Sequence, residues 1–208
     1  MNVVILFFER ITALDAIGPY EVLSRLPGAR VTFAGLEVGP VRTDNRMLGL
    51  HVDQPIDAIA SADILLVPGG HGTRALCEDE RVLAWIKKIH ATTTWTTSVC
   101  TGSLVLGAAG LLKGKRATTH WALLDGLAKY DAQPVSERVV QDGKVVTAAG
   151  VSAGIDMALT LMASIAGEDF ARAIQLGIEY DPAPPFEGGS VDNTPPGIVE
   201  LVRAQITR

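Results

Sequence analysis

A single cysteine stands between a stretch typical of a buried strand and a stretch typical of a short core helix. Residues 93–97 are β-branched apart from Trp95, and residues 102–110 are small and apolar. Cys100 is therefore expected on a sharp strand-to-helix turn, where backbone strain exposes a side chain above a sheet. The helix N-terminus would point at the sulfur, so we expect a lowered pKa and a reactive thiolate. The alternative is a structural cysteine that is simply buried by packing.

Apolar runs that alternate with helical patterns indicate the fold class. Residues 3–7 and 64–68 are continuously apolar, as expected of strands buried on both faces of a sheet. The expected helices cover residues 14–23, 80–91 and 155–166, and hairpins are expected over residues 41–50 and 135–148. The helix at 155–166 is apolar nearly all round, so we expect it to be central. The alternation predicts an α/β fold, with a doubly wound, mostly parallel sheet sandwiched by helices.

Composition excludes several classes of protein. The chain has 208 residues, of which 48% are hydrophobic and 20% charged, as in a globular protein. We expect one domain over residues 1–208, with a proline-rich C-terminal arm at 181–208. The net charge of −5 argues against nucleic acid and against an anionic membrane surface as partners. Two cysteines and an early strand, with no room for a signal peptide, favour the reducing cytoplasm.

Polar and small residues follow several of the expected strands, and this convergence is the main internal argument for a site. Asp15 follows the first strand, Gly69 and Gly70 follow the strand at 64–68, and Cys100 and His120 also stand at strand ends. In an open α/β sheet such ends border one crevice. Each residue also has a plain structural reading: a helix N-cap for the aspartate, an ordinary turn for the glycines, and a hydrogen-bonded structural side chain for the histidine.

Four short motifs carry a resemblance to a known family. They are residues 14–19 (LDAIGP), 67–70 (VPGG), 98–102 (SVCTG) and 118–121 (TTHW). With them the sequence resembles the ThiJ/PfpI superfamily, whose fold is flavodoxin-like and shared with class I glutamine amidotransferases. Residues 137–140 and the proline-rich 179–186 make it most similar to the isocyanide-hydrating members.

The resemblance implies a homodimer that uses no metal and no organic cofactor. It implies that Cys100 is the nucleophile, that Asp15 is the acid residue, and that Thr101 stands where peptidase members carry histidine. A cysteine–histidine dyad of adjacent residues is thus absent, which counts against peptidase activity. The candidate catalytic residues are Cys100, Asp15 and Thr101, and the candidate substrate- or oxyanion-binding residues are Gly69, Gly70, His120 and Ser152.

The implied reaction is hydration of an isocyanide to an N-substituted formamide, with attack by the Cys100 thiolate and proton transfer by Asp15. Three other functions use the same residues. A glyoxalase-like enzyme would act on methylglyoxal, and a redox sensor would oxidise Cys100 reversibly without turnover. A ligand-sensing module would need a DNA-binding domain, for which we expect no room after residue 180.

Overall fold

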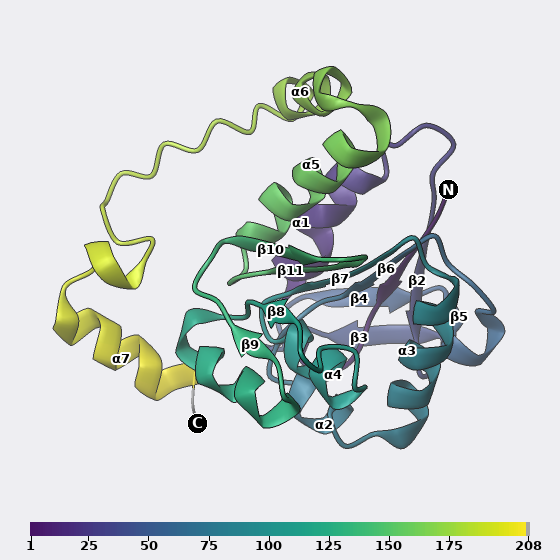
Figure 1. The fold of residues 1–208 in the computed structure, drawn as a ribbon, viewed down its shortest axis with the longest axis horizontal. Coiled ribbons are helices and arrows are strands. Elements are labelled where there is room, and N and C mark those ends of the chain that lie inside the picture. Colours follow the sequence, from purple (N-terminus) through teal and green to yellow (C-terminus); the bar gives the residue numbers. More distant parts are fainter. Residues whose placement is uncertain (207–208) are drawn as a thin grey trace.

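Seven strands form the central sheet of the protein, in the order β10-β11-β7-β6-β1-β2-β5 (Figure 1). The computed structural model describes residues 1–206. The strands are β1 Asn2–Leu6, β2 Arg30–Gly35, β5 Gln54–Pro55, β6 Ile64–Val67, β7 Trp95–Val99, β10 Val139–Asp142 and β11 Val145–Ala148. All neighbouring pairs are parallel except the hairpin of β10 with β11. The predicted doubly wound, mostly parallel sheet is confirmed.

Helices cover both faces of this sheet. On one face α1 (Ala13–Leu23) packs against α5 (Ala153–Ala166), which packs in turn against α6 (Glu168–Gly177). The opposite face carries α2 (Thr73–Leu76), α3 (Glu80–Thr92), α4 (Gly102–Ala108) and the 3₁₀ segment η2 (Trp121–Tyr130). The central strands are almost fully buried between these layers, as the apolar runs of β1 and β6 require, and β7 is buried as well although it carries Thr96, Thr97 and Ser98.

The α5 helix is a covering helix, so the prediction that it is central is wrong. Its buried residues fall on one face: Ala153, Gly154, Met157, Ala158, Leu161 and Met162. The hydroxyl groups of Thr160 and Ser164 on another face donate to carbonyl oxygens one turn earlier in the same helix. These two internally bonded hydroxyls let an apolar-looking helix expose part of its surface.

Two small sheets lie outside the central one. The strands β3 (Gly39–Arg42) and β4 (Gly49–Val52) form the predicted antiparallel hairpin, and β8 (Arg116–Ala117) pairs with β9 (Gln133–Pro134). The short 3₁₀ helix η1 covers Ile56–Ala58. The strand that leads toward His120 is therefore β8, not a member of the main sheet.

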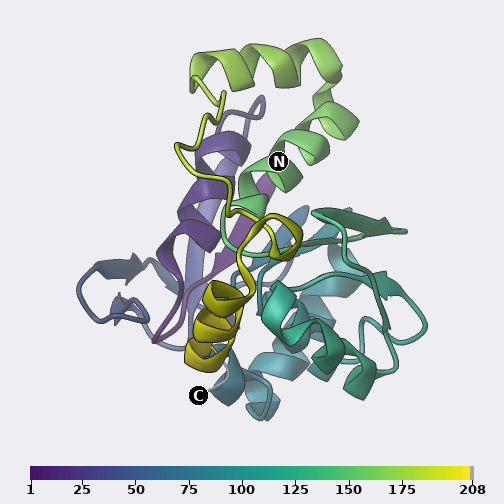
Figure 2. The same ribbon diagram turned by 90° about the vertical axis from the view of Figure 1, so that its left-hand side faces the viewer.

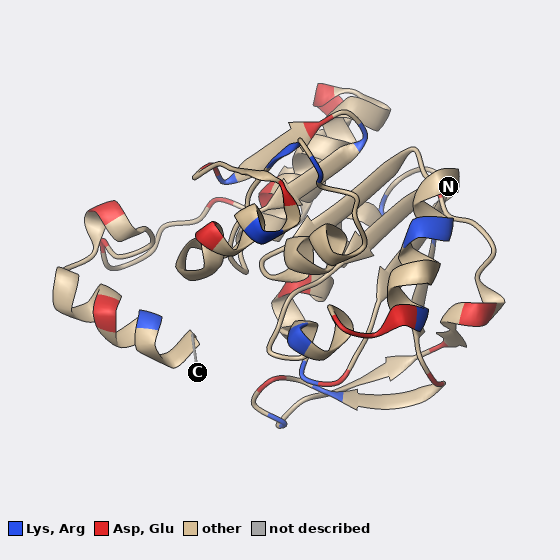
Figure 3. Ribbon diagram, turned by 60° about the horizontal axis from the view of Figure 1, so that its bottom comes forward, with Lys and Arg blue, Asp and Glu red and all other residues tan. Residues whose placement is uncertain are grey.

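A C-terminal arm follows α6. Residues 181–190 are exposed throughout, then come the 3₁₀ turn η3 (Val191–Asn193) and helix α7 (Pro196–Ile206). Acidic and basic residues are interspersed along the chain (Figure 3). Within residues 1–206, no helix combines the length and apolar character needed to cross a membrane.

Gly102 fixes how closely helix α4 approaches strand β6. A Cβ atom at this position would collide with the backbone carbonyl oxygen of Val67. We expect Gly102→Ala to lower the free energy of unfolding by on the order of 3 kcal/mol, because backbone cannot move aside as a flexible side chain can. Gly197→Ala is the control, since a Cβ there meets no atom within 4 Å. Urea unfolding of both variants measures the difference, and equal stabilities would contradict this packing argument.

Candidate active site

The Cys100 side chain lies on the predicted turn, between the end of β7 at Val99 and the start of α4 at Gly102. Its φ angle is 55°, the left-handed region that non-glycine residues rarely adopt. The strained turn is held by its backbone: the Cys100 N–H donates to the Ala149 carbonyl (2.9 Å), and its own carbonyl accepts from Thr119 Oγ1 (2.8 Å). The residue is only 6% exposed, and backbone N–H groups of Thr101 and Val151 donate to its sulfur.

Asp15 meets Cys100 beneath the carboxyl ends of the strands. It is the third residue of α1, fully buried, and its Oδ2 accepts a hydrogen bond from the Gly69 N–H at 2.9 Å. Its Oδ1 has no hydrogen-bond partner among the described residues. The N-cap of α1 is Thr12, so the helix-cap reading of Asp15 is wrong.

Burial dominates the electrostatics of this pair. It raises the pKa of Asp15 from its ordinary 3.8 to about 7, against the opposing hydrogen bonds from Gly69 and Cys100. Burial and the neighbouring Asp15 charge also raise the pKa of the Cys100 thiol, more than the two amide donors lower it. The expectation of a depressed cysteine pKa is therefore wrong, because desolvation at this depth outweighs the N-terminus of the seven-residue α4. The two groups titrate as one coupled pair.

The glycine pair after β6 holds other site residues in place. The Gly69 N–H is used by Asp15, and the Gly70 N–H donates to Thr101 Oγ1 at 2.9 Å. A Cβ at residue 69 would stand 2.8 Å from Asp15 Oδ2, so this close approach requires glycine. Both N–H groups are therefore engaged by Asp15 and Thr101, and Gly70 also lines the pocket above Cys100. Thr101 Oγ1 also accepts from Thr73 Oγ1 at 3.1 Å.

His120 lies at the start of η2 and at the edge of the pocket. It is the N-cap of η2, where its Nδ1 accepts from the Ala122 N–H at 3.2 Å, and its ring also borders the same pocket as Cys100. Burial lowers the pKa of this histidine, so the ring is neutral. Because Nδ1 is an acceptor, the ring proton is on Nε2.

Ser152 is not brought to the pocket. It is exposed, and its Oγ accepts from the Arg138 guanidinium at 3.3 Å, beside the Arg138–Asp156 ion pair. Its neighbour Val151 borders the pocket instead. Val151 has a positive φ of 33°, a turn that the sequence did not indicate.

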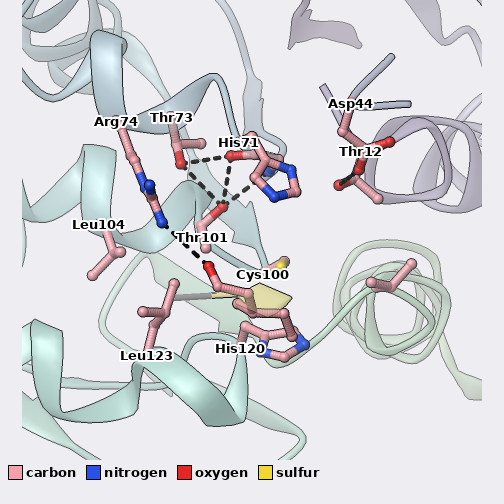
Figure 4. Close-up of a pocket in the computed structure, with 13 residues that line it drawn as sticks. Thr12, Asp44, His71, Thr73, Arg74, Cys100, Thr101, Leu104, His120 and Leu123 are labelled. Atoms are coloured by element: carbon pink, nitrogen blue, oxygen red, sulfur yellow. Dashed lines mark hydrogen bonds between the residues drawn. The ribbon is translucent and has the colours of Figure 1, made fainter. Parts of the chain in front are cut away.

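The pocket above Cys100 has a volume of about 300 Å³ (Figure 4). Its apolar lining comes from four separate elements: Leu104, Leu123, Val151 and Ile206. Its polar lining includes residues that sequence reasoning missed: Thr12, Asp44, Thr73 and Arg74. No local motif marks these four, since only the folded chain joins Thr12 Oγ1 to Asp44 Oδ2 (2.9 Å).

Within residues 1–206, no three histidine, cysteine or acidic side chains are grouped as a metal site.

Comparison with known proteins agrees with this geometry. Residues 1–164 match the DJ-1/PfpI family. Since the match covers more than half of the chain, the protein belongs to this family.

Several individual proteins are similar to this chain over most of its length. The chain is 47% identical over 198 residues to the isonitrile hydratase of Pseudomonas putida, covering 95% of this chain and 86% of that protein. The crystal structure of a ThiJ/PfpI family protein from Pseudomonas syringae superposes with a TM-score of 0.96 at 36% identity, covering 99% of this chain and 86% of that chain. The HTH-type transcriptional regulator CdhR of Pseudomonas aeruginosa is 33% identical over 76% of this chain, which spans 48% of the regulator.

Proposed function

We propose that this protein is an isocyanide hydratase, a lyase that adds water to R–N≡C and releases the formamide R–NH–CHO. The observation that carries the proposal is a buried cysteine that lines a mainly apolar pocket and lies beside a buried carboxyl group of raised pKa. The 47% identity to an isonitrile hydratase supports it, since isonitrile and isocyanide are two words for one functional group.

The first step forms a carbon–sulfur bond. The terminal isocyanide carbon is electrophilic toward soft nucleophiles, and the Cys100 sulfur attacks it. A proton delivered by Asp15 reaches the same carbon, giving the thioimidate R–N=CH–S–Cys. The N–H groups of Thr101 and Val151 hold the sulfur in place while its charge changes.

The second step consumes water. Asp15, now a carboxylate, takes a proton from a water molecule whose oxygen adds to the thioimidate carbon. Asp15 passes this proton to the nitrogen, which gives R–NH–CH(OH)–S–Cys. The hydroxyl group then gives its proton back to the Cys100–Asp15 pair as the carbon–sulfur bond breaks and the formamide leaves. The His120 Nε2–H is the donor that we assign to the developing formamide oxygen. Neither step changes the overall oxidation level, so these side chains and water balance the reaction.

The reactive form of the Cys100–Asp15 pair carries one proton and one negative charge. With two protons the sulfur is a neutral thiol with no base beside it, and with none there is no proton to donate. Since the pair loses its first proton at about pH 7, we expect kcat/KM to rise roughly tenfold per pH unit below that value and to level off above it. Initial rates from pH 5 to 9, corrected for the enzyme-free reaction, measure this. A fall above pH 7 would instead make the doubly protonated pair the reactive form.

The direct test is incubation of the purified protein with an aryl isocyanide in ¹⁸O-labelled water. We expect the N-aryl formamide to form with one ¹⁸O in its carbonyl group, as measured by mass spectrometry. A parallel incubation with methylglyoxal separates the glyoxalase alternative. Conversion of methylglyoxal with no formamide produced from the isocyanide would overturn the proposal.

We also propose that the protein works as a homodimer in the reducing cytoplasm. The face formed by α1, α5 and α6 supports the homodimer, because it exposes Leu14 and Leu176 (42% and 78%) and carries a depression lined by Leu14, Ile17 and Ile155. Light scattering of dilute protein is expected to give twice the 22.0 kDa chain mass. A single species at the chain mass would contradict the dimer. The two unpaired cysteines suit a reducing compartment.

A further inference from the structure

Helix α7 borders the pocket although it lies far along the chain from the other lining residues. The exposed residues 181–190 carry the chain from the α6 side of the sheet to the opposite side, where α7 lies near η2 (Figures 1 and 2). Ile206, in its last turn, borders the Cys100 pocket together with Leu104 and Leu123. Because residues 181–190 are exposed, they do not fix the position of α7, and the contacts of α7 itself must hold it in place.

Two contacts fix the helix there. The Arg74 guanidinium donates to the Ile206 carbonyl oxygen at 3.2 Å (Figure 4), and so satisfies a carbonyl that the helix end leaves without an intrahelical partner. The Arg203 guanidinium lies over the Trp121 ring, 4.9 Å from its centroid. Arg74 itself lines the pocket, so one side chain both borders the site and anchors its outer wall.

We propose that Ile206 of α7 determines the size of the substituent that the site accepts, a role that rests on the proposed isocyanide chemistry. The group R–N≡C is linear, so when its terminal carbon is at the Cys100 sulfur the substituent extends away from the sulfur into the remaining pocket. That space is bounded by Leu104, Leu123 and Ile206, which favour an uncharged, apolar substituent. Of these three, only Ile206 comes from outside the α/β body, so it is the wall that can change without altering the catalytic turn.

The test changes the volume of this wall. Ile206→Ala enlarges the pocket and Ile206→Trp reduces it, and each variant is assayed with a small alkyl isocyanide and with a bulky aryl isocyanide. We expect the ratio of kcat/KM (bulky over small) to rise about tenfold or more in Ile206→Ala and to fall similarly in Ile206→Trp, since each added or removed methylene changes discrimination by about 10-fold or more. Leu201→Ala is the control, because that side chain is 61% exposed on the same helix and does not border the pocket.

A second measurement separates this proposal from the hydratase assignment. Alkylation of Cys100 by iodoacetamide and by a bulky N-aryl iodoacetamide, read by peptide mass spectrometry at alkaline pH, needs no isocyanide turnover. The ratio of the two rates cancels the thiolate fraction and reports only on access. We expect the same opposite shifts in the two Ile206 variants and none in Leu201→Ala. Unchanged ratios in both assays would overturn the role of Ile206, whereas shifted alkylation ratios without hydration would overturn only the isocyanide chemistry.

Discussion

Cys100→Ala is expected to lower isocyanide turnover by on the order of 10⁶-fold, to the background rate, as when other enzymes lose a catalytic nucleophile. The methyl group that remains cannot form the thioimidate, and among the described residues Cys100 is the only cysteine that lines the pocket. The fold should persist, because the Cys100 N–H donates to the Ala149 carbonyl and the Cys100 carbonyl accepts from the Thr119 hydroxyl, and neither bond involves the sulfur. Formamide production measures the activity, and circular dichroism with urea unfolding measures the fold.

Two further variants sharpen this result. Cys77→Ala is the matched control, because Cys77 is the other cysteine, ends helix α2 and does not border the pocket. It should keep wild-type turnover. Cys100→Ser should be as inactive as the alanine variant, since a serine hydroxyl beside a carboxyl group of pKa about 7 stays protonated. Measurable turnover above a few per cent in Cys100→Ala would remove this residue from the role of nucleophile.

The main sheet and the closeness of Cys100 to Asp15 were predictable from local sequence. The runs at 3–7 and 64–68 had to be buried on both faces, which indicated parallel strands, and parallel strands end at one edge. That rule placed Asp15 and Cys100 together before any contact was known. It also placed His120 near them, although the strand before it belongs to a different small sheet.

The raised pKa of the Cys100 thiol and the partners of the glycine N–H groups were not predictable from the same patterns. The turn motif indicated amide donors to the Cys100 sulfur, which are present, but not how far burial would oppose them. Likewise the glycines after β6 indicated free N–H groups, whereas the folded chain uses them for Asp15 and Thr101. The pKa of Cys100 and the partners of the glycine N–H groups both depend on tertiary packing, which a short stretch of sequence does not determine.

Long-range contacts account for the other omissions. The Arg74–Ile206 hydrogen bond joins residues 132 apart in sequence, and the Thr12–Asp44 bond joins a helix start to a hairpin turn. The proline-rich arm was expected as an arm, but no local pattern marked Ile206 as its residue that borders the pocket. Ser152 was expected at the site but does not line the pocket. Its hydroxyl accepts a hydrogen bond from Arg138, and its neighbour Val151 lines the pocket.

Asp15→Asn is expected to lower hydration by about 10²–10⁴-fold, the usual contribution of a positioned acid–base group. The amide keeps the shape of the side chain, and its oxygen still accepts from the Gly69 N–H, so the substrate pocket should be unchanged. Asp15→Glu restores a proton donor, but the extra methylene crowds the sulfur in a fully buried position, so we expect little recovery of activity. Asp57→Asn, at an exposed carboxyl group paired with Arg81, is the control for the same chemical change away from the site.

Asp15→Asn should also change how the stability of the protein depends on pH. Because the folded pKa of Asp15 is about 7 and its ordinary value is 3.8, the native state binds more protons than the unfolded state between these values. The free energy of unfolding of the wild type therefore falls as pH rises through this window, by about 3 kcal/mol between pH 5 and pH 8 for this one group. The asparagine variant lacks this loss, so its stability relative to the wild type should increase by about that amount between the two pH values in urea unfolding. If Asp15→Asn hydrated an aryl isocyanide at near wild-type rate, the acid–base role of Asp15 would be wrong. If the stability of Asp15→Asn relative to the wild type did not change with pH, the raised pKa of Asp15 would be wrong.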